Sequence, residues 1–292
     1  MLRPVKRFAF FFLALIASSA AQELKQIGPC RHVPTDWADG DSFQISTPDG
    51  KAVTVRLYAA DCIEWHVTDE SDARRLREQR RYFGISGPAG KSAESIQLAK
   101  DFGKAAAVET ARALAKPFTI HTTFADARGD GRHPRVYAYV TTADGEDLSA
   151  RLVKLGLARA FGVYRETADG VSKAELIERF DDLEFQAARL GKGVWAKTDW
   201  NALPEQRRLQ REEDAELAEA TGGAKLASGE KIDPNTAARD ELMRLPGIGE
   251  KTANLIISGR PYGSITDLDQ VDGIGEATLK RLKPHLMFKT VP

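Results

Sequence analysis

Three carboxylates and one guanidinium fall close together early in the chain. The carboxylates belong to Asp41, Asp61 and Glu64, and the guanidinium to Arg56. Carboxylate oxygens suit a hard divalent cation such as calcium, and Cys62 would add only its backbone carbonyl, because a thiol is a poor ligand for such a cation. Arginine binds phosphate oxygens, and a further carboxylate can polarise a water molecule. The combination therefore predicts phosphodiester chemistry.

The elements that must position these residues are short strands followed by helices. Period-two alternation in Ser42–Ser46 and in residues 53–57, joined by the turn Pro48-Asp49-Gly50, predicts a β-hairpin. Short strands with helices around them predict an α+β fold built on a small closed barrel of OB type. Further strands are expected at residues 118–124 and 136–142, and helices at residues 93–116, 148–160 and 171–190.

The order Asp-Gly-Asp-Ser, then Arg-Leu at a strand end, then Asp-x-x-Glu resembles the staphylococcal nuclease family. The resemblance covers most of residues 30–200. It continues at Arg135-Val136-Tyr137-Ala138-Tyr139-Val140, at Gly156-Leu157-Ala158 and at Gly193-Val194-Trp195. It implies an OB-fold nuclease domain that needs calcium and leaves 3′-phosphate ends.

The resemblance also implies roles for individual residues. Asp41 and Asp61, with the backbone carbonyl of Cys62, would bind Ca²⁺, and Glu64 would act as general base or orient the attacking water. Arg56 and a second arginine would hold the scissile phosphate. Arg135 is chosen for the second arginine because it directly precedes a strand, and Arg128 and Arg132 stay open as alternatives. Tyr164 and Arg165 would contact the substrate.

Residues 65–100 form an insertion relative to the family pattern. Its arginines lie near Tyr82 and Phe83 and would suit a substrate groove, since arginine binds phosphates and aromatic rings stack on bases. Neighbouring acidic residues balance them, which favours a solvated helix face instead, and no site residue is expected there. The arginines are Arg74, Arg75, Arg77, Arg80 and Arg81.

Two Gly-x-Gly turns near the C-terminus resemble helix-hairpin-helix motifs, and residues 232–288 resemble the tandem domain of competence-type DNA receptors. Such turns expose backbone amides at the positive end of a helix, where a phosphate binds without base recognition. The alternative is that the glycines only cap helices in a protein-interaction module. The expected DNA-phosphate contacts are Gly247, Ile248, Gly249, Lys251, Gly273, Ile274 and Gly275.

The chain's ends and composition suggest its organisation. Arg3, Lys6 and Arg7 precede an apolar run and small residues, as in a secretory signal peptide. We expect a signal peptide at residues 1–21, a nuclease domain at 22–200, a charged and then flexible linker at 201–230, and a small all-α domain at 231–292. Lys+Arg and Asp+Glu are equal at 42 each, so a claim of nucleic-acid binding must rest on local sites.

These patterns predict an exported calcium-dependent endonuclease, periplasmic or secreted, that acts on DNA, with RNA left open. No membrane attachment after signal cleavage and no protein partner is implied. The alternative is a non-catalytic extracytoplasmic DNA-binding or uptake receptor, and a third class is a protein-interaction scaffold. The sequence leaves open whether Cys30 and Cys62 form a disulfide.

Overall fold

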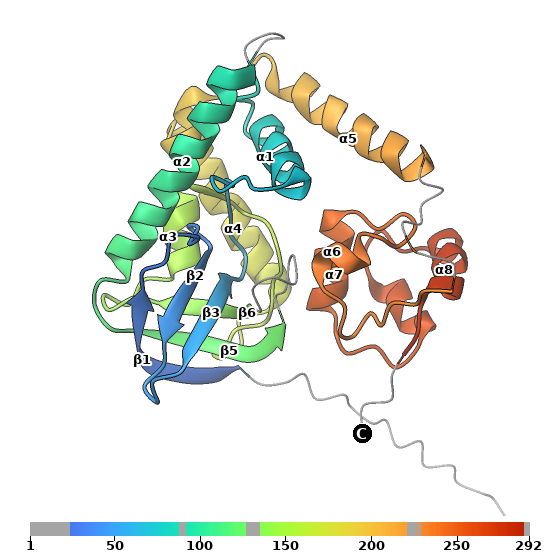
Figure 1. The fold of residues 1–292 in the computed structure, drawn as a ribbon, viewed down its shortest axis with the longest axis horizontal. Helices are drawn as coiled ribbons and strands as arrows, with labels where there is room; N and C mark the ends of the chain where they lie inside the picture. Colours follow the sequence, from blue (N-terminus) through green and yellow to red (C-terminus); the bar gives the residue numbers. More distant parts are fainter. Residues whose placement is uncertain (1–23, 88–91, 127–134, 221–225, 227–228, 289–292) are drawn as a thin grey trace, which may run out of the picture.

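The computed structural model describes residues 24–87, 92–126, 135–220, 226 and 229–288 (Figure 1). The expected signal peptide and the alternative arginines Arg128 and Arg132 lie outside these residues. Within the described part of the chain, no helix is long and apolar enough to cross a membrane.

Five strands close a barrel in the order β1-β2-β3-β6-β5. The predicted hairpin is confirmed, with Ser42 paired to Arg56 and Ser46 paired to Ala52. Strands β3 and β6 pair in parallel and the other neighbours are antiparallel, which gives the expected OB-type barrel. The strands are β1 (Lys25–Val33), β2 (Ser42–Ser46), β3 (Ala52–Leu57), β5 (Phe118–Asp126) and β6 (Val136–Thr141).

Strand β1 was not expected from the sequence. Gly28 and Pro29 interrupt its pattern, and proline has no N–H to donate to a strand ladder. The structure accommodates them through a shift of register between Ile27 and Cys30, where β1 pairs with β5.

Helix α3 packs against β6, helices α2 and α4 pack on α3, and α1 packs on α2 (Figure 1). These helices are α1 (Glu70–Tyr82), α2 (Ser92–Ala113), α3 (Leu148–Lys154) and α4 (Lys173–Arg189). The helix predicted for residues 148–160 is wrong at its C-terminal end. Gly156 has φ +67°, and a Cβ atom there would lie 2.2 Å from the Lys192 carbonyl oxygen, so the chain leaves the helix at a position that requires glycine. The short strand β7 (Ala158–Arg159) follows and pairs with β4 (Asp61–Cys62).

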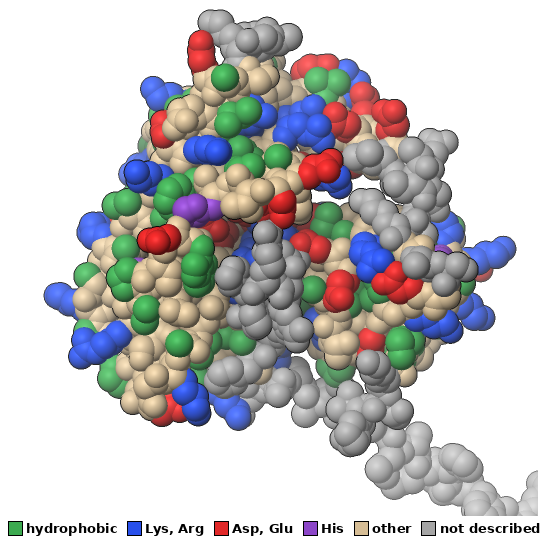
Figure 2. All heavy atoms as spheres, in the orientation of Figure 1, with side chains coloured by type: hydrophobic (Ala, Val, Ile, Leu, Met, Phe, Trp, Pro, Cys, Tyr) green, Lys and Arg blue, Asp and Glu red, His purple; other side chains and the backbone are tan. Residues whose placement is uncertain are grey.

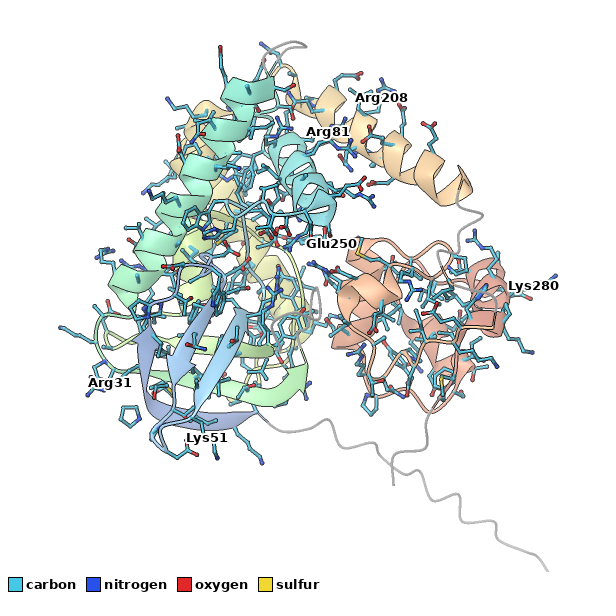
Figure 3. All side chains as sticks on the ribbon, viewed as in Figure 1. Arg31, Lys51, Arg81, Arg208, Glu250 and Lys280 are labelled. Carbon is cyan, nitrogen blue, oxygen red and sulfur yellow. The ribbon has the colours of Figure 1, made fainter. Side chains whose placement is uncertain are left out.

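After the short helix η1 (Gly193–Lys197), the charged stretch expected in the linker forms helix α5 (Leu203–Ala220). This helix is attached to α1 by charged side chains. Arg81 Nη1 lies 2.6 Å from Glu213 Oε2 and donates to Gln210 Oε1 at 2.8 Å, and Figure 3 shows Arg81 between the two helices. The limits proposed for the domains stay a prediction.

The C-terminal part is helical, as predicted. Ile248 and Ile274 are buried in it, and the adjacent Gly247 and Gly273 have φ +80° and +88°, a conformation that favours glycine. Its elements are α6 (Arg239–Leu242), α7 (Glu250–Ser258), η2 (Ile265–Gln270), α8 (Glu276–Leu282) and η3 (Lys283–His285).

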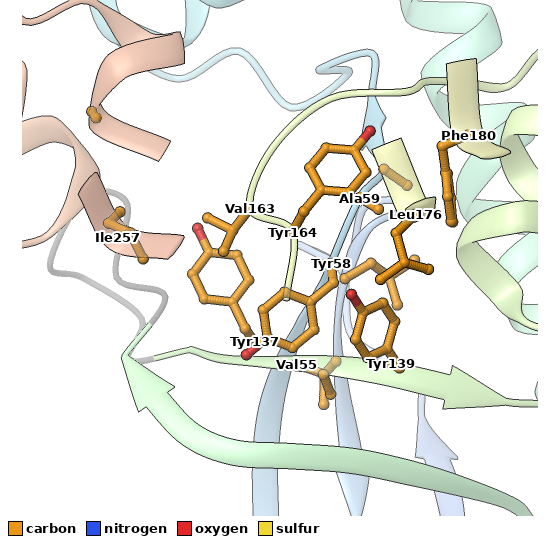
Figure 4. Packing of buried hydrophobic residues seen from close by; sticks show 14 of the residues in the cluster. Val55, Tyr58, Ala59, Tyr137, Tyr139, Val163, Tyr164, Leu176, Phe180 and Ile257 are labelled. Atoms are coloured by element: carbon orange, nitrogen blue, oxygen red, sulfur yellow. The ribbon is translucent and has the colours of Figure 1, made fainter. Parts of the chain in front are cut away.

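One hydrophobic cluster contains buried residues of both the barrel region and the C-terminal helices. Figure 4 shows Ile257 of α7 next to Tyr137 and Val163. The backbone N–H of Tyr164 also donates to Ser258 Oγ at 3.3 Å. The C-terminal domain is therefore packed against the barrel rather than separated from it.

Candidate active site

The structure brings together the carboxylates and the arginine that the sequence singled out. Asp41 directly precedes β2, Arg56 lies in β3, and Asp61 begins β4, with Glu64 just beyond. Because Ser42 pairs with Arg56, the start of β2 lies beside the end of β3. All four side chains are buried.

Asp61 is the most heavily bonded member of the site, and its side chain is 1% exposed. Its Oδ1 lies 3.1 Å from Arg56 Nη2 and 3.4 Å from Arg75 Nη2. Its Oδ2 accepts from Arg159 Nε at 2.8 Å and from Gln79 Nε2 at 2.9 Å. Burial alone would raise the pKa of this carboxyl, but the charges of Arg159, Arg75 and Arg56 outweigh burial and hold the pKa well below its usual range. Asp61 is therefore ionised.

Glu64 is held by one strong ion pair, between its Oε1 and Arg75 Nη2 at 2.6 Å. Burial raises the pKa of Glu64, and the neighbouring charges of Asp41 and Asp61 raise it further, while Arg75 and Arg56 oppose them. The net shift is upward. A carboxylate with a raised pKa accepts a proton more readily, which suits the predicted role of general base.

Asp41 is fixed by two hydrogen bonds. The Cys62 backbone N–H donates to its Oδ2 at 2.8 Å, and Ser42 Oγ donates to its Oδ1 at 3.0 Å. Arg135 Nη1 in turn donates to Ser42 Oγ at 3.3 Å. The structure thus places Arg135, the arginine chosen from the sequence, beside this group of carboxylates.

Three residues of the site were missed by sequence reasoning: Arg75, Gln79 and Arg159. The expectation that the inserted helix is solvated is wrong for the face of α1 that carries Arg75 and Gln79, whose side chain contacts reach Asp61. The two residues are four positions apart and so lie on one face of a helix. That spacing was the available signal. Arg159 carried a weaker one, because it directly follows the Gly156-Leu157-Ala158 segment.

Gln79 joins three parts of the active-site loop. Its Nε2 donates to the Cys62 carbonyl oxygen at 2.7 Å as well as to Asp61 Oδ2. Its Oε1 accepts from the Glu64 backbone N–H at 2.9 Å. One buried side-chain amide therefore provides hydrogen-bond partners for the Asp61 carboxylate, the Cys62 carbonyl and the Glu64 N–H.

The acidic residues fit a hard divalent cation in part. Asp39 Oδ1 is buried without a hydrogen-bond partner, and burial together with the charges of Glu64 and Asp41 raises the pKa of Asp39 well above its usual range. Added positive charge would relieve this repulsion, and carboxylate oxygens suit calcium. Gln79 Nε2 donates to both Asp61 Oδ2 and the Cys62 carbonyl oxygen. For either oxygen to bind a cation, it would have to share or give up its hydrogen bond with Gln79. Among the residues that the structure describes, no three His, Cys, Asp or Glu side chains are already arranged to hold a metal ion.

The expected substrate contacts at Tyr164 and Arg165 have a different setting. The Tyr164 ring packs edge-on against Phe180 at a centroid distance of 6.0 Å, within the hydrophobic cluster (Figure 4). The backbone of Arg165 exchanges hydrogen bonds with the Tyr139 hydroxyl. Tyr164 therefore has a packing role, and its contact with a nucleotide stays a prediction.

The expected phosphate-binding turns precede helices, as the resemblance implied. Gly249 and Gly275 are the N-cap residues of α7 and α8, and the space where a Cβ would stand is open at both. Lys251 is exposed, with its Nζ 3.9 Å from Asp272. The two thiols, Cys30 and Cys62, are buried and not joined by a disulfide.

Comparisons with known proteins agree with both parts of the chain. Residues 79–197 match the staphylococcal nuclease homologue family, and residues 227–287 match the helix-hairpin-helix motif. A deoxyribonuclease of Thioalkalivibrio sp. (strain K90mix) is 39% identical over 69 residues, which cover 24% of this chain and 17% of that protein. The endonuclease/exonuclease/phosphatase family domain-containing protein 1 of Xenopus laevis is 39% identical over 62 residues, covering 20% and 11% respectively. The chain thus spans less than a fifth of the length of these relatives.

The family match begins at Gln79 and includes Arg135 and Arg159. The carboxylates precede the matched segment, and the contacts of Gln79 and Arg159 with Asp61 join the two. With its closed OB-type barrel, this chain contains a staphylococcal nuclease homologue domain, followed by a helix-hairpin-helix motif.

Proposed function

We propose that this protein is an exported, calcium-dependent endonuclease that cleaves DNA, and RNA as a second substrate class, to 3′-phosphate ends. The observation that carries the proposal is the buried group of Asp41, Asp61 and Glu64 with Arg56 and with Arg135 beside it. Buried acids and arginines in one place suit the cleavage of a phosphodiester, where a water must be activated and negative charge stabilised.

In the proposed reaction, Glu64 orients the attacking water and accepts its proton as the water oxygen bonds to phosphorus. The P–O5′ bond breaks, and the 5′-oxygen leaves as a hydroxyl after taking a proton from solvent. Arg56 and Arg135 bind the phosphate and stabilise the charge that develops on its oxygens. Arg75 keeps the Glu64 carboxylate in place through the 2.6 Å ion pair. When bound beside Asp41, calcium would supply further positive charge to a non-bridging phosphate oxygen.

The helix-hairpin-helix motif would bind the DNA backbone through the turns before α7 and α8, and so raise the concentration of DNA at the nuclease domain. The name of one relative, a deoxyribonuclease, supports DNA as the substrate. Binding through backbone amides would not depend on base sequence.

The test is incubation of the purified mature chain with plasmid and single-stranded DNA, with calcium or with a chelator, beside Glu64→Gln. We expect cleavage to require calcium and to fall by about 10²–10⁴-fold in the variant, the usual contribution of a general base. Glu70→Gln, on the first turn of α1, is the matched control because that residue is exposed. DNA retention without cleavage in every condition would instead identify a receptor.

Export is tested separately, by expressing the whole chain and sequencing the N-terminus of the protein outside the cytoplasm. Removal of residues 1–21 is the expected result. Protein that stays in the cytoplasm with an intact N-terminus would contradict it.

A further inference from the structure

A cavity of about 130 Å³ lies between α1 and the C-terminal domain. Four arginines line it, two from α1 and two from the first half of the helix-hairpin-helix domain. Three acidic residues line it as well. Acidic and basic side chains lie on both sides of the boundary between the two domains (Figure 2). The charged lining residues are Arg74, Arg75, Arg239, Arg244, Glu78, Asp240 and Glu250.

Glu250, in the first turn of α7, connects this cavity to the active site. Its Oε1 lies 2.9 Å from Arg239 Nη1, and its Oε2 lies 3.4 Å from Arg159 Nη2. Arg159 Nε in turn contacts Asp61. Figure 3 shows Glu250 on the side of the C-terminal domain that faces the barrel. The side chain of Arg159 thus bridges Glu250, at the start of α7, and the buried carboxylate of Asp61.

The cavity contains arginine donors that no protein acceptor uses. Within the described residues, Arg74 has no hydrogen bond or ion pair, and its neighbour Arg75 has a buried Nε without an acceptor. Arg239 contacts the carboxylates of Glu250 at 2.9 Å and of Asp240 at 3.2 Å, so its guanidinium is held where it binds anionic oxygens. Guanidinium groups bind phosphate in the same way.

We propose that this cavity is a second phosphate-binding subsite, which holds a phosphodiester of the DNA strand that is being cleaved. The proposal rests on the proposed nuclease function and adds a place where the strand is held between the two domains. Arg74 and Arg239 are its main donors, and the bound phosphate competes with Glu250 for Arg239. Free inorganic phosphate has the same chemistry, and the test separates it from DNA.

Helix α1 sets the position of the cavity relative to the candidate active site. Arg75 reaches the active site through Glu64, while the preceding residue, Arg74, lines the cavity. The helix is held from its other side by the ion pair between Arg81 and Glu213 of α5. A strand bound in the cavity therefore has a fixed position relative to Glu64.

The experiment compares Arg74→Gln and Arg74→Glu with Arg31→Gln, an exposed arginine of β1 that lies away from the C-terminal domain (Figure 3). Binding of a single-stranded oligonucleotide is measured by fluorescence anisotropy in chelator, over a series of salt concentrations. We expect binding to weaken several-fold in Arg74→Gln and further in Arg74→Glu. The slope of log K against log salt should fall by about 0.7 in Arg74→Gln, the value for one phosphate contact on a single strand. Arg31→Gln should match the wild type.

The kinetics of cleavage, measured in the presence of calcium, give an independent test. The KM of Arg74→Gln for a long oligonucleotide should rise several-fold more than its KM for a dinucleotide, which has a single phosphodiester and so cannot fill the active site and the cavity together. Unchanged binding and salt slope in both Arg74 variants, or equal effects on both substrates, would overturn the proposal. If the wild type cleaves nothing, the nuclease assignment fails, but binding in chelator still decides whether the subsite exists.

Inorganic phosphate is the probe for a free anion. We expect it to displace the oligonucleotide no better than chloride at equal ionic strength. Stronger displacement that disappears in Arg74→Gln would assign the cavity to free phosphate and overturn its assignment to DNA.

Discussion

The Nη2 atom of Arg75 lies 2.6 Å from Oε1 of Glu64, which is buried, and the Arg75 side chain is only 15% exposed. This ion pair ties the inserted helix α1 to the candidate general base. Arg75 also contacts Asp61 at 3.4 Å, so one guanidinium orders two carboxylates. The inserted helix therefore contributes a side chain, that of Arg75, to the candidate active site.

Arg75→Gln should lower the rate of DNA cleavage by about 10²-fold, because Glu64 loses the group that positions it and the site loses a positive charge. Arg75→Lys should recover part of the rate, since it keeps the charge but not the planar donor pair. The rate is measured under saturating DNA, after confirming that each variant is folded. Cleavage at the wild-type rate by Arg75→Gln would show that the contact only stabilises the fold.

Gln79→Met should reduce the free energy of unfolding by about 2 kcal/mol or more, because it removes the partner of three buried polar groups while nearly keeping the side-chain volume. Those groups are Asp61 Oδ2, the Cys62 carbonyl and the Glu64 N–H. Urea unfolding measures the change. Gln97→Met, at an exposed position of α2, is the control and should stay within about 0.5 kcal/mol of the wild type.

Gly156→Ala should cost about 3 kcal/mol, because it combines a positive φ with a close backbone contact. The new Cβ would lie 2.2 Å from the Lys192 carbonyl oxygen. Gly145→Ala is a matched control, since Gly145 also has a positive φ, of +83°, but open space around its Cα. It should cost only about 1 kcal/mol in urea unfolding. Equal costs for the two variants would mean that the contact with Lys192 is easily relaxed.

Glu78 should make the protein less stable as the pH rises. Burial raises its pKa to about 7 from 4.5, with smaller contributions from the charges of Glu250 and Asp214, while Arg159 and Arg75 oppose the shift. The folded state then binds the proton more tightly than the unfolded state. This stabilisation is complete below the unfolded pKa and is lost as the pH rises through the folded one.

Glu78→Gln is neutral at every pH and should remove this part of the decline. Urea midpoints at about pH 5 and about pH 8 measure it, and the difference between them should be smaller in the variant than in the wild type. Glu70→Gln, an exposed residue of the same helix, should leave the difference unchanged. A wild-type difference retained in full by Glu78→Gln would contradict the assignment.

The sequence by itself determined the barrel hairpin, most of the helices and the candidate residues Asp41, Arg56, Asp61, Glu64 and Arg135. Period-two alternation and the spacing of charged residues are local properties of the chain, so they could be read without a structure. The glycine turns before α7 and α8 were readable for the same reason, because glycine marks backbone conformations that other residues avoid.

Only the tertiary structure decided which other side chains complete the site. Arg159 reaches Asp61 because β7 pairs with β4, two segments almost a hundred residues apart in the chain. Arg75 and Gln79 reach the site because α1 turns its polar face inward, against the usual expectation for so charged a helix. The contact of Glu250 with Arg159 depends on how the C-terminal domain packs on the barrel. Such contacts depend on long-range packing, which local patterns in the sequence do not encode.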